Sequence, residues 1–239
     1  MTETCNCNNC RNELCIRKVP IFSTLNQEDV GKIASLINHR DYKKGETILF
    51  DGDYTDSVVI INEGSAKAYK NTPDGREQIL YVFSEGDFFG EQNLLGNKTA
   101  TFSVEALQPV NTCILSRGQF QKLLYSYPEI AVKIIEELSG RMARLETALQ
   151  SMGVRNVDTR VGGILLEFAT KYSTKTNEGT LIHLPLSREG IANYLGVARE
   201  TLSRKLGQLE NEGLIRSVNN KEILIPNMQA IELLAGAGY

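Results

Sequence analysis

The chain has 239 residues, of which 41% are hydrophobic, and a formal net charge of -3. This length allows one large domain or two ordinary ones with real cores, and the acidic balance excludes a protein whose whole surface coats nucleic acid. The polar start lacks the basic and apolar regions of a signal peptide, and no apolar run approaches the ~20 residues of a membrane span. We therefore expect a cytoplasmic protein with no membrane partner.

Residues 1–18 form a polar segment that holds four of the five cysteines: Cys5, Cys7, Cys10 and Cys15. In a reducing compartment such a cluster is more typical of metal binding or redox chemistry than of a disulfide framework. Zinc held by these four thiols is one alternative, although the compressed spacing suits a tetrahedral site poorly. A disulfide switch between one of them and Cys113 is another. A third is a segment without function, with Cys113 an ordinary buried strand residue.

Residues 19–127 carry short apolar runs separated by glycine-containing turns. A helix is predicted over 26–37. Six runs rich in β-branched and aromatic residues predict strands at 47–50, 57–62, 65–70, 78–83, 102–107 and 111–116. Strands of this length and spacing indicate a β-sandwich or roll. We expect Glu91 to be a structural carboxylate, and His39 and His183 to be surface or structural residues.

Residues 128–153 change to a helical period. The apolar positions recur in steps of three and four: Ile135, Leu138, Met142, Leu145, Leu149 and Met152. This is the a/d pattern of a two-stranded coiled coil and predicts a dimerisation helix. The alternative is one amphipathic helix that lies on the β domain.

Residues 154–239 predict a winged helix-turn-helix. After a helix at 160–172, Ser187 is a suitable N-cap for a helix that ends near Tyr194. Leu195, Gly196 and Val197 form a tight turn, with Ala192 small where the helices cross, before a second helix at 198–211. The second helix buries Val197, Leu202, Leu206 and Leu209, and residues 214–225 form a β-hairpin wing around Asn219 and Asn220.

The second helix presents Arg199, Glu200, Ser203 and Arg204 near its start, where a recognition helix contacts base edges in the major groove. Arginine suits guanine, and glutamate accepts a hydrogen bond from cytosine. The alternative is a solvated face in which Glu200 pairs with Arg204. Further candidate DNA contacts are Ser187, Arg188, Lys205, Arg216 and Lys221. Two such domains on a twofold seam would read an inverted repeat.

Segments along the whole chain resemble the CRP/FNR family of bacterial transcription regulators. They are KKGETILFDGD (43–53), INEGSAKAYK (61–70), DGREQIL (74–80), GDFFGE (86–91) and SREGIANYLGVARETLSRKLGQLENEGLI (187–215). The resemblance implies an α+β fold: a double-stranded β-helix (jelly-roll) domain like those that bind cyclic nucleotides, a long dimerisation helix and a winged helix-turn-helix. It also implies double-stranded DNA and RNA polymerase as partners. No GxSxG, Walker or HExxH motif suggests an enzyme.

Within the family, members that bind a cyclic nucleotide resemble one another in an Arg-Ser or Arg-Thr pair that grips the phosphate. Here the aligned residues are Ala100 and Thr101, no arginine lies between Gly90 and Val110, and the long helix offers Leu145 and Glu146 in place of hydroxyls. A cyclic nucleotide is therefore not expected.

FNR-type members ligate an iron–sulfur cluster through a C-x2-C-x5-C run and one distant cysteine. Cys7, Cys10 and Cys15 match this run with one residue fewer, Cys113 matches the distant position, and Cys5 is a substitute ligand. The resemblance thus implies a [4Fe–4S] cluster and a regulator that responds to oxygen or redox state. A thiol–disulfide switch remains open, as does a small ligand or haem bound in the roll near Phe88, Phe89, Leu94 and Leu95.

Overall fold

The computed structural model describes residues 19–22, 25–34, 36–91, 99–153 and 157–236. Cys5, Cys7, Cys10, Cys15, Leu94 and Leu95 lie outside these ranges. For Leu145, Leu149 and Met152 the structure describes the backbone but not the side chains. The chain divides into two compact units: residues 1–70 with 82–142, and residues 71–81 with 143–239. Among the described helices, none is long and apolar enough to cross a membrane.

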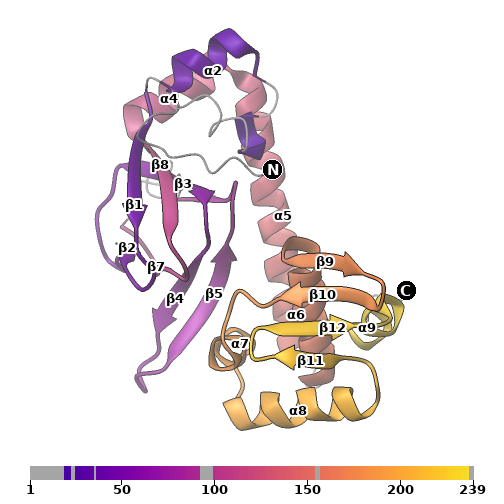
Figure 1. Ribbon diagram of the computed structural model, residues 1–239. Helices are drawn as coiled ribbons and strands as arrows, with labels where there is room; N and C mark the ends of the chain where they lie inside the picture. Colours follow the sequence, from indigo (N-terminus) through magenta and orange to yellow (C-terminus); the bar gives the residue numbers. More distant parts are fainter. Residues whose placement is uncertain (1–18, 23–24, 35, 92–98, 154–156, 237–239) are drawn as a thin grey trace. The chain divides into compact units, whose positions relative to one another are not determined.

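The strands of the first unit, together with strand β5, most of which belongs to the second unit, form two four-stranded sheets (Figure 1). One has the strand order β1-β8-β3-β6, and the other has the order β2-β7-β4-β5. The strands are β1 (Asn38–Tyr42), β2 (Thr47–Leu49), β3 (Ser57–Glu63), β4 (Ala66–Asn71), β5 (Glu77–Phe83), β6 (Phe88–Phe89), β7 (Ser103–Ala106) and β8 (Val110–Ser116). All six predicted strands are present, whereas β1 and the two-residue β6 were not predicted.

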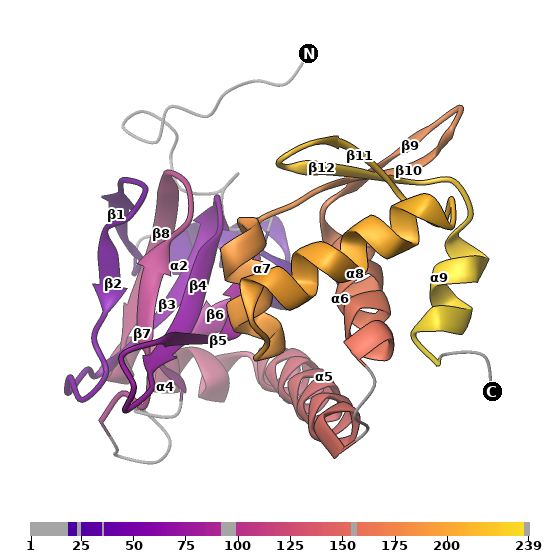
Figure 2. The ribbon, with the colours of Figure 1, turned by 90° about the horizontal axis from the view of Figure 1, so that it is seen from below.

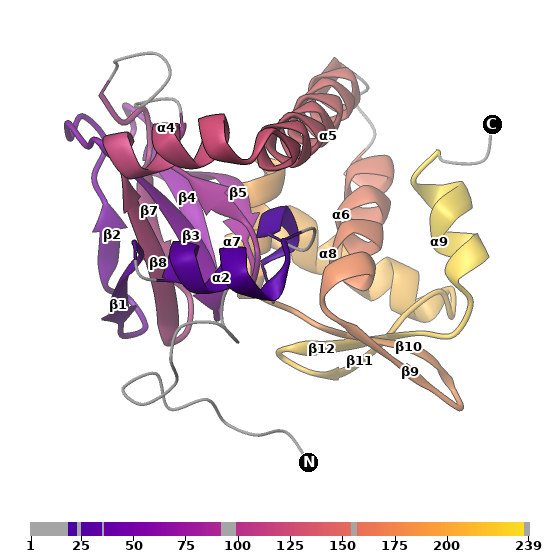
Figure 3. The ribbon, with the colours of Figure 1, turned by 90° about the horizontal axis from the view of Figure 1, so that it is seen from above.

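Helices pack on one face of the first sheet, as Figure 3 shows for α2 and α4. They are η1 (Pro20–Phe22), α2 (Gln27–Ala34), α4 (Arg117–Ser126) and the start of α5 (Pro128–Gly153). The predicted helix at 26–37 is thus shorter, and α4 was not predicted although Ser116 and Gln119 form its capping box. Val30, Phe120 and Ile130 from these helices meet Ile60 and Cys113 of the sheet in one buried cluster.

The second unit holds a small sheet and four helices in the described chain. The sheet has the strand order β11-β12-β10-β9. The elements are α6 (Val157–Lys171), β9 (Ser173–Thr176), β10 (Gly179–His183), α7 (Arg188–Leu195), α8 (Arg199–Asn211), β11 (Arg216–Asn219), β12 (Glu222–Ile225) and α9 (Met228–Leu234). Strands β9 and β10 and helix α9 were not predicted. The β-roll, the long helix and the winged helix-turn-helix follow in the predicted order, which confirms the fold class.

Candidate nucleic-acid interface and sensor core

The helix-turn-helix is built by local sequence signals. The Ser187 hydroxyl accepts a hydrogen bond from the Gly190 amide at the start of α7, as predicted for its N-cap. Gly196 then takes a left-handed conformation with a φ of 63°, which glycine adopts without strain. Figure 2 shows α7 and α8 on either side of this turn.

The inward side of α8 is largely as predicted. Leu202, Leu206 and Leu209 are buried, and so is Ala192 where α7 crosses α8. Val197 was predicted to belong to this buried stripe, but it is only half-buried. The reason is its position in the turn before α8, where the chain is not yet helical.

The outward side of α8 carries Arg199, Glu200, Ser203 and Arg204, all of them exposed. Within the described chain no ion pair joins Glu200 to Arg204. The polar groups of this face are therefore available to an external partner, which favours base contact over an internally paired surface.

The predicted phosphate contacts are not equivalent. The ammonium of Lys205 contacts Asp158 of α6 and donates to Gln208 at 2.8 Å, and its side chain is only 18% exposed. Lys205 thus holds α8 against α6, and its predicted phosphate contact would require this ion pair to open. Arg216 pairs with Glu178, but both side chains are well exposed, and Lys221 is exposed in the wing.

Arg188 is half-buried at the start of α7, where a guanidinium nitrogen donates to the Ser217 hydroxyl at 3.4 Å. Burial lowers the pKa of Arg188, and the nearby Glu210 carboxylate opposes this. Arg188 thus links α7 to β11 of the wing and places positive charge beside Ser187.

Helix α5 has two distinct faces in the described chain. Ile130 and Ile134 are buried against the roll, and Leu138 is partly buried on the same cluster. Val132, Ile135 and Met142 are exposed apolar residues, with Ile135 and Met142 both 62% exposed. Leu138 therefore packs at least in part on its own chain, whereas Val132, three positions before Ile135, extends the exposed row in a way that was not predicted.

Cys113 lies fully buried on β8 and faces His39 on the neighbouring strand β1. Its Sγ is 3.8 Å from Nδ1 of His39. The other imidazole nitrogen, Nε2, is buried without a hydrogen-bond partner in the described chain. His39 is thus structural, as predicted, but sequence gave no sign that it meets Cys113. The described residues contain no group of three or more side chains suited to a metal ion.

Inside the roll, a cavity of about 190 Å³ opens between the two sheets. Its apolar walls include Val59, Phe89 and Ile114, and polar groups reach it from Arg40 and Asp53. Ala100, which the family resemblance aligns with the phosphate-binding arginine, is buried and its amide donates to the Asp53 carbonyl at 2.8 Å.

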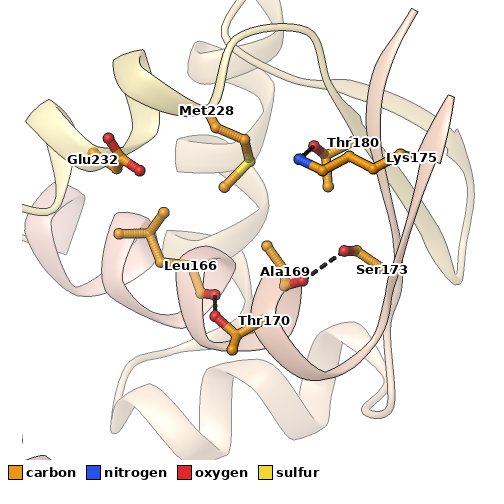
Figure 4. Close-up of a pocket in the computed structure, with 8 residues that line it drawn as sticks. All are labelled: Leu166, Ala169, Thr170, Ser173, Lys175, Thr180, Met228 and Glu232. Carbon is orange, nitrogen blue, oxygen red and sulfur yellow. Dashed lines mark hydrogen bonds between the residues drawn. The ribbon is translucent and has the colours of Figure 1, made fainter. Parts of the chain in front are cut away.

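A larger cavity of about 450 Å³ lies in the second unit between α6, the β9–β10 hairpin and α9 (Figure 4). Its hydroxyl groups already bond within the wall: Thr170 donates to the Leu166 carbonyl, Ser173 donates to the Ala169 carbonyl, and Thr180 accepts from the Lys175 ammonium. The cavity lies outside the polar face of α8 and contains none of the predicted site residues.

Comparison with known proteins agrees with this geometry. Residues 39–127 match the model of the cyclic nucleotide-binding domain, and residues 159–234 match the Crp-like helix-turn-helix domain. A probable transcriptional regulator, flp, of Lacticaseibacillus casei is 31% identical over 218 residues, which cover 91% of this chain and 96% of that protein. The chain belongs to the CRP/FNR family of transcription regulators.

The family resemblance extends to proteins with different names. A CRP-like cAMP-activated global transcriptional regulator of Mycobacterium tuberculosis is 25% identical over 216 residues, covering 90% of this chain and 96% of that one. The structure of FixK2 from Bradyrhizobium japonicum is 26% identical with a TM-score of 0.73, covering 83% and 96%. CRP/FNR proteins are DNA-binding transcription regulators, not enzymes, and membership does not select one effector.

Proposed function

We propose that the protein is a cytoplasmic, homodimeric regulator of the FNR-like branch that reads an inverted repeat and responds to oxygen or redox state. The observation that carries the DNA-binding part is the exposed polar face of α8, where Arg199, Glu200, Ser203 and Arg204 contact no other charged group in the described chain. RNA polymerase is the expected partner of the protein on DNA.

Base reading by this face follows from the chemistry of its side chains. Arg204 and Arg199 can each donate two hydrogen bonds to guanine, and Glu200 can accept one from cytosine. Ser187 and Arg188 at the start of α7, with Arg216 and Lys221 in the wing, supply the phosphate contacts that set the register of α8.

The dimer follows from the exposed row on α5. Val132, Ile135 and Met142 leave apolar surface in water on a single chain, and a second α5 can cover it. Leu145, Leu149 and Met152 continue the predicted seam towards the end of the helix. A twofold pair of α8 helices then reads half-sites one DNA turn apart, about 34 Å.

The sensory input is proposed at Cys113 together with the N-terminal cysteines. Val19, the first described residue, belongs to the same buried cluster as Cys113. Cys15 precedes Val19 by four residues, a reach of at most about 14 Å. The chain length therefore permits an N-terminal thiol to approach β8, and four thiolates suit a [4Fe–4S] cluster. When bound, the cluster would supply sensitivity to oxygen, with Cys7, Cys10, Cys15 and Cys113 as ligands and Cys5 as a substitute.

Two further inputs are supported by specific observations. A disulfide between Cys113 and an N-terminal cysteine requires only two sulfurs, and the 3.8 Å contact with His39 places a base beside the Cys113 thiol. A small effector could occupy the 190 Å³ cavity of the roll. A cyclic nucleotide is disfavoured, because Ala100 offers no charge to a phosphate.

The deciding experiment measures iron and acid-labile sulfide in protein purified without oxygen, with absorbance spectra before and after air. About four of each per chain and bleaching in air are expected for the cluster. A colourless, iron-free protein after reconstitution would contradict it. Operator affinity that then changes with a thiol oxidant, and no longer does in Cys113→Ala, would identify the disulfide switch.

A further inference from the structure

Arg141 joins α5 to the roll through several contacts at once. One guanidinium nitrogen donates to the backbone carbonyl of Phe88 on β6 at 2.7 Å. A second lies 3.7 Å from the Glu91 carboxylate, and Nε lies 3.7 Å from Glu137 one helical turn earlier. The side chain is only 13% exposed, so these contacts form largely away from water.

Aromatic rings complete the surroundings of this guanidinium. Its central carbon lies 4.6 Å from the centre of the Phe88 ring and 5.7 Å from that of Phe83. A planar cation within about 6 Å of an aromatic face is attracted to it. Arginine alone can stack in this way while also donating to a carbonyl and facing a carboxylate.

Glu91, the acidic partner of Arg141, is a buried carboxylate with incomplete hydrogen bonding in the described chain. Its side chain is 9% exposed, and Oε2 is buried without a hydrogen-bond partner in the described chain. A buried carboxylate that is held mainly by one cation depends strongly on where that cation lies. The Arg141–Glu91 pair is therefore sensitive to small movements of α5 relative to β6.

The position of Arg141 along α5 links its contacts with the roll to the direction in which Met142 points. Ile130, Ile134 and Leu138 face the roll at helical spacing, and Arg141 is the last described side chain of this row. The next residue, Met142, is 62% exposed. Since neighbouring residues on a helix are turned by about 100°, the contact that fixes Arg141 inward also fixes the direction of Met142.

We propose that Arg141 is a positioning residue that sets the rotation of α5 on the roll and so presents Met142 to a second copy of the chain. The inference rests on the proposed function only in taking α5 as the dimer helix. Any change at β6 or Glu91 reaches the seam through this guanidinium. No external ligand is needed to bridge Glu91 and α5, because the chain supplies the cation itself.

The test replaces Arg141 in the full-length chain. In Arg141→Met, which keeps the length of the side chain without its charge, we expect the dimer dissociation constant to rise about tenfold. Arg141→Lys should not restore it, because an ammonium cannot stack and donate in the same geometry. Glu137→Gln is the matched control, since it removes the more exposed of the two carboxylates near Arg141 and should leave dimerisation within about twofold.

A second measurement reports rotation rather than stability. Single cysteines at Met142 and at Glu136, an exposed residue roughly 120° round the helix from Met142, are cross-linked between copies with a short bis-maleimide, over the natural cysteines as common background. With Arg141 present, Met142→Cys should cross-link faster than Glu136→Cys; with Arg141→Met, the two rates should converge. If Arg141→Met alone does not fold, the double variant with Glu91→Gln removes both buried charges. The two cross-linking rates are then compared in that double variant.

The outcomes are distinct. A folded Arg141→Met chain that dimerises and cross-links like the natural protein would overturn the positioning role. A natural protein that is monomeric at all concentrations and on its operator would instead refute the proposed dimer. Loss of dimerisation with the cross-linking preference preserved in the remaining dimer would also count against Arg141, because the rotation would then be set elsewhere.

Discussion

On α8 the residues proposed to contact DNA are exposed and fall within six consecutive positions. In contrast, Cys113 and His39 of the roll and Arg141 of α5 are buried or half-buried and come from three distant segments. The first arrangement needs only a correctly formed helix to present its side chains. The second needs the whole roll to be folded before any contact exists. A regulator can therefore change its DNA target by substitutions on one helix, while a change of input requires coordinated substitutions across a core.

The largest effect is expected for a substitution on the exposed face of α8. Arg204→Ala removes one proposed base contact from each half-site, and such a contact contributes about 1–3 kcal/mol to discrimination. Operator affinity should therefore fall by roughly 30-fold or more, measured by fluorescence anisotropy, with unchanged melting temperature. Arg76→Ala, an exposed arginine of a roll turn, should leave affinity unchanged; equal losses in the two variants would indicate a general charge effect.

Substitutions on the two faces of α5 should affect dimerisation and folding stability separately. Met142→Glu places a charge in the proposed seam and should abolish the dimer in sedimentation experiments. Because Met142 is exposed on the single chain, the unfolding free energy of the monomer should change by less than about 0.5 kcal/mol. Leu138→Ala should instead cost the fold about 1–3 kcal/mol, since Leu138 packs on the roll. A normal Met142→Glu dimer would refute the seam.

Two adjacent glycines of α6 test packing in the DNA-binding unit. A Cβ on Gly162 would lie 2.9 Å from the Ala235 amide nitrogen after α9, whereas one on Gly163 meets nothing within 4 Å. Gly162→Ala should therefore destabilise the protein by about 1–3 kcal/mol, and Gly163→Ala should stabilise it by about 0.5–1 kcal/mol. Denaturant unfolding measures both; two changes of the same sign would contradict close packing of α6 against α9.

The smallest effect concerns the buried carboxylate of the roll. Burial raises the pKa of Glu91 above its usual value, and the Arg141 charge only partly opposes this. The folded protein therefore binds the Glu91 proton more tightly than the unfolded chain does, and the contribution of Glu91 to stability falls as pH rises from the ordinary pKa through the raised one. Glu91→Gln should match the natural protein near pH 4 and become slightly more stable towards pH 7. An unfolding free-energy difference that is independent of pH would contradict the shift.

The fold and the DNA-binding elements could be predicted because their signals are local. Ser187 caps α7, Gly196 makes the turn, and Leu202 and Leu206 mark the buried side of α8 within a few residues of one another. The commitment of Lys205 to Asp158 was missed, since it depends on how α6 packs against α8. The His39–Cys113 contact joins residues 74 positions apart, and Arg141 meets Phe88 over 53 positions. No periodicity in the sequence encodes such pairs.

The internal pairing of two basic residues has a consequence for binding in salt. Lys205 is neutralised by Asp158, and Arg216 is paired with Glu178 before any DNA arrives. The salt dependence of DNA affinity counts the ions that a protein releases from the phosphates. A cation that must first leave an internal carboxylate exchanges one partner for another, so Arg216 and Lys205 should add less to this slope than Lys221, which has no ion pair among the described residues. The protein should therefore hold its operator at higher ionic strength than its number of basic side chains near α8 suggests.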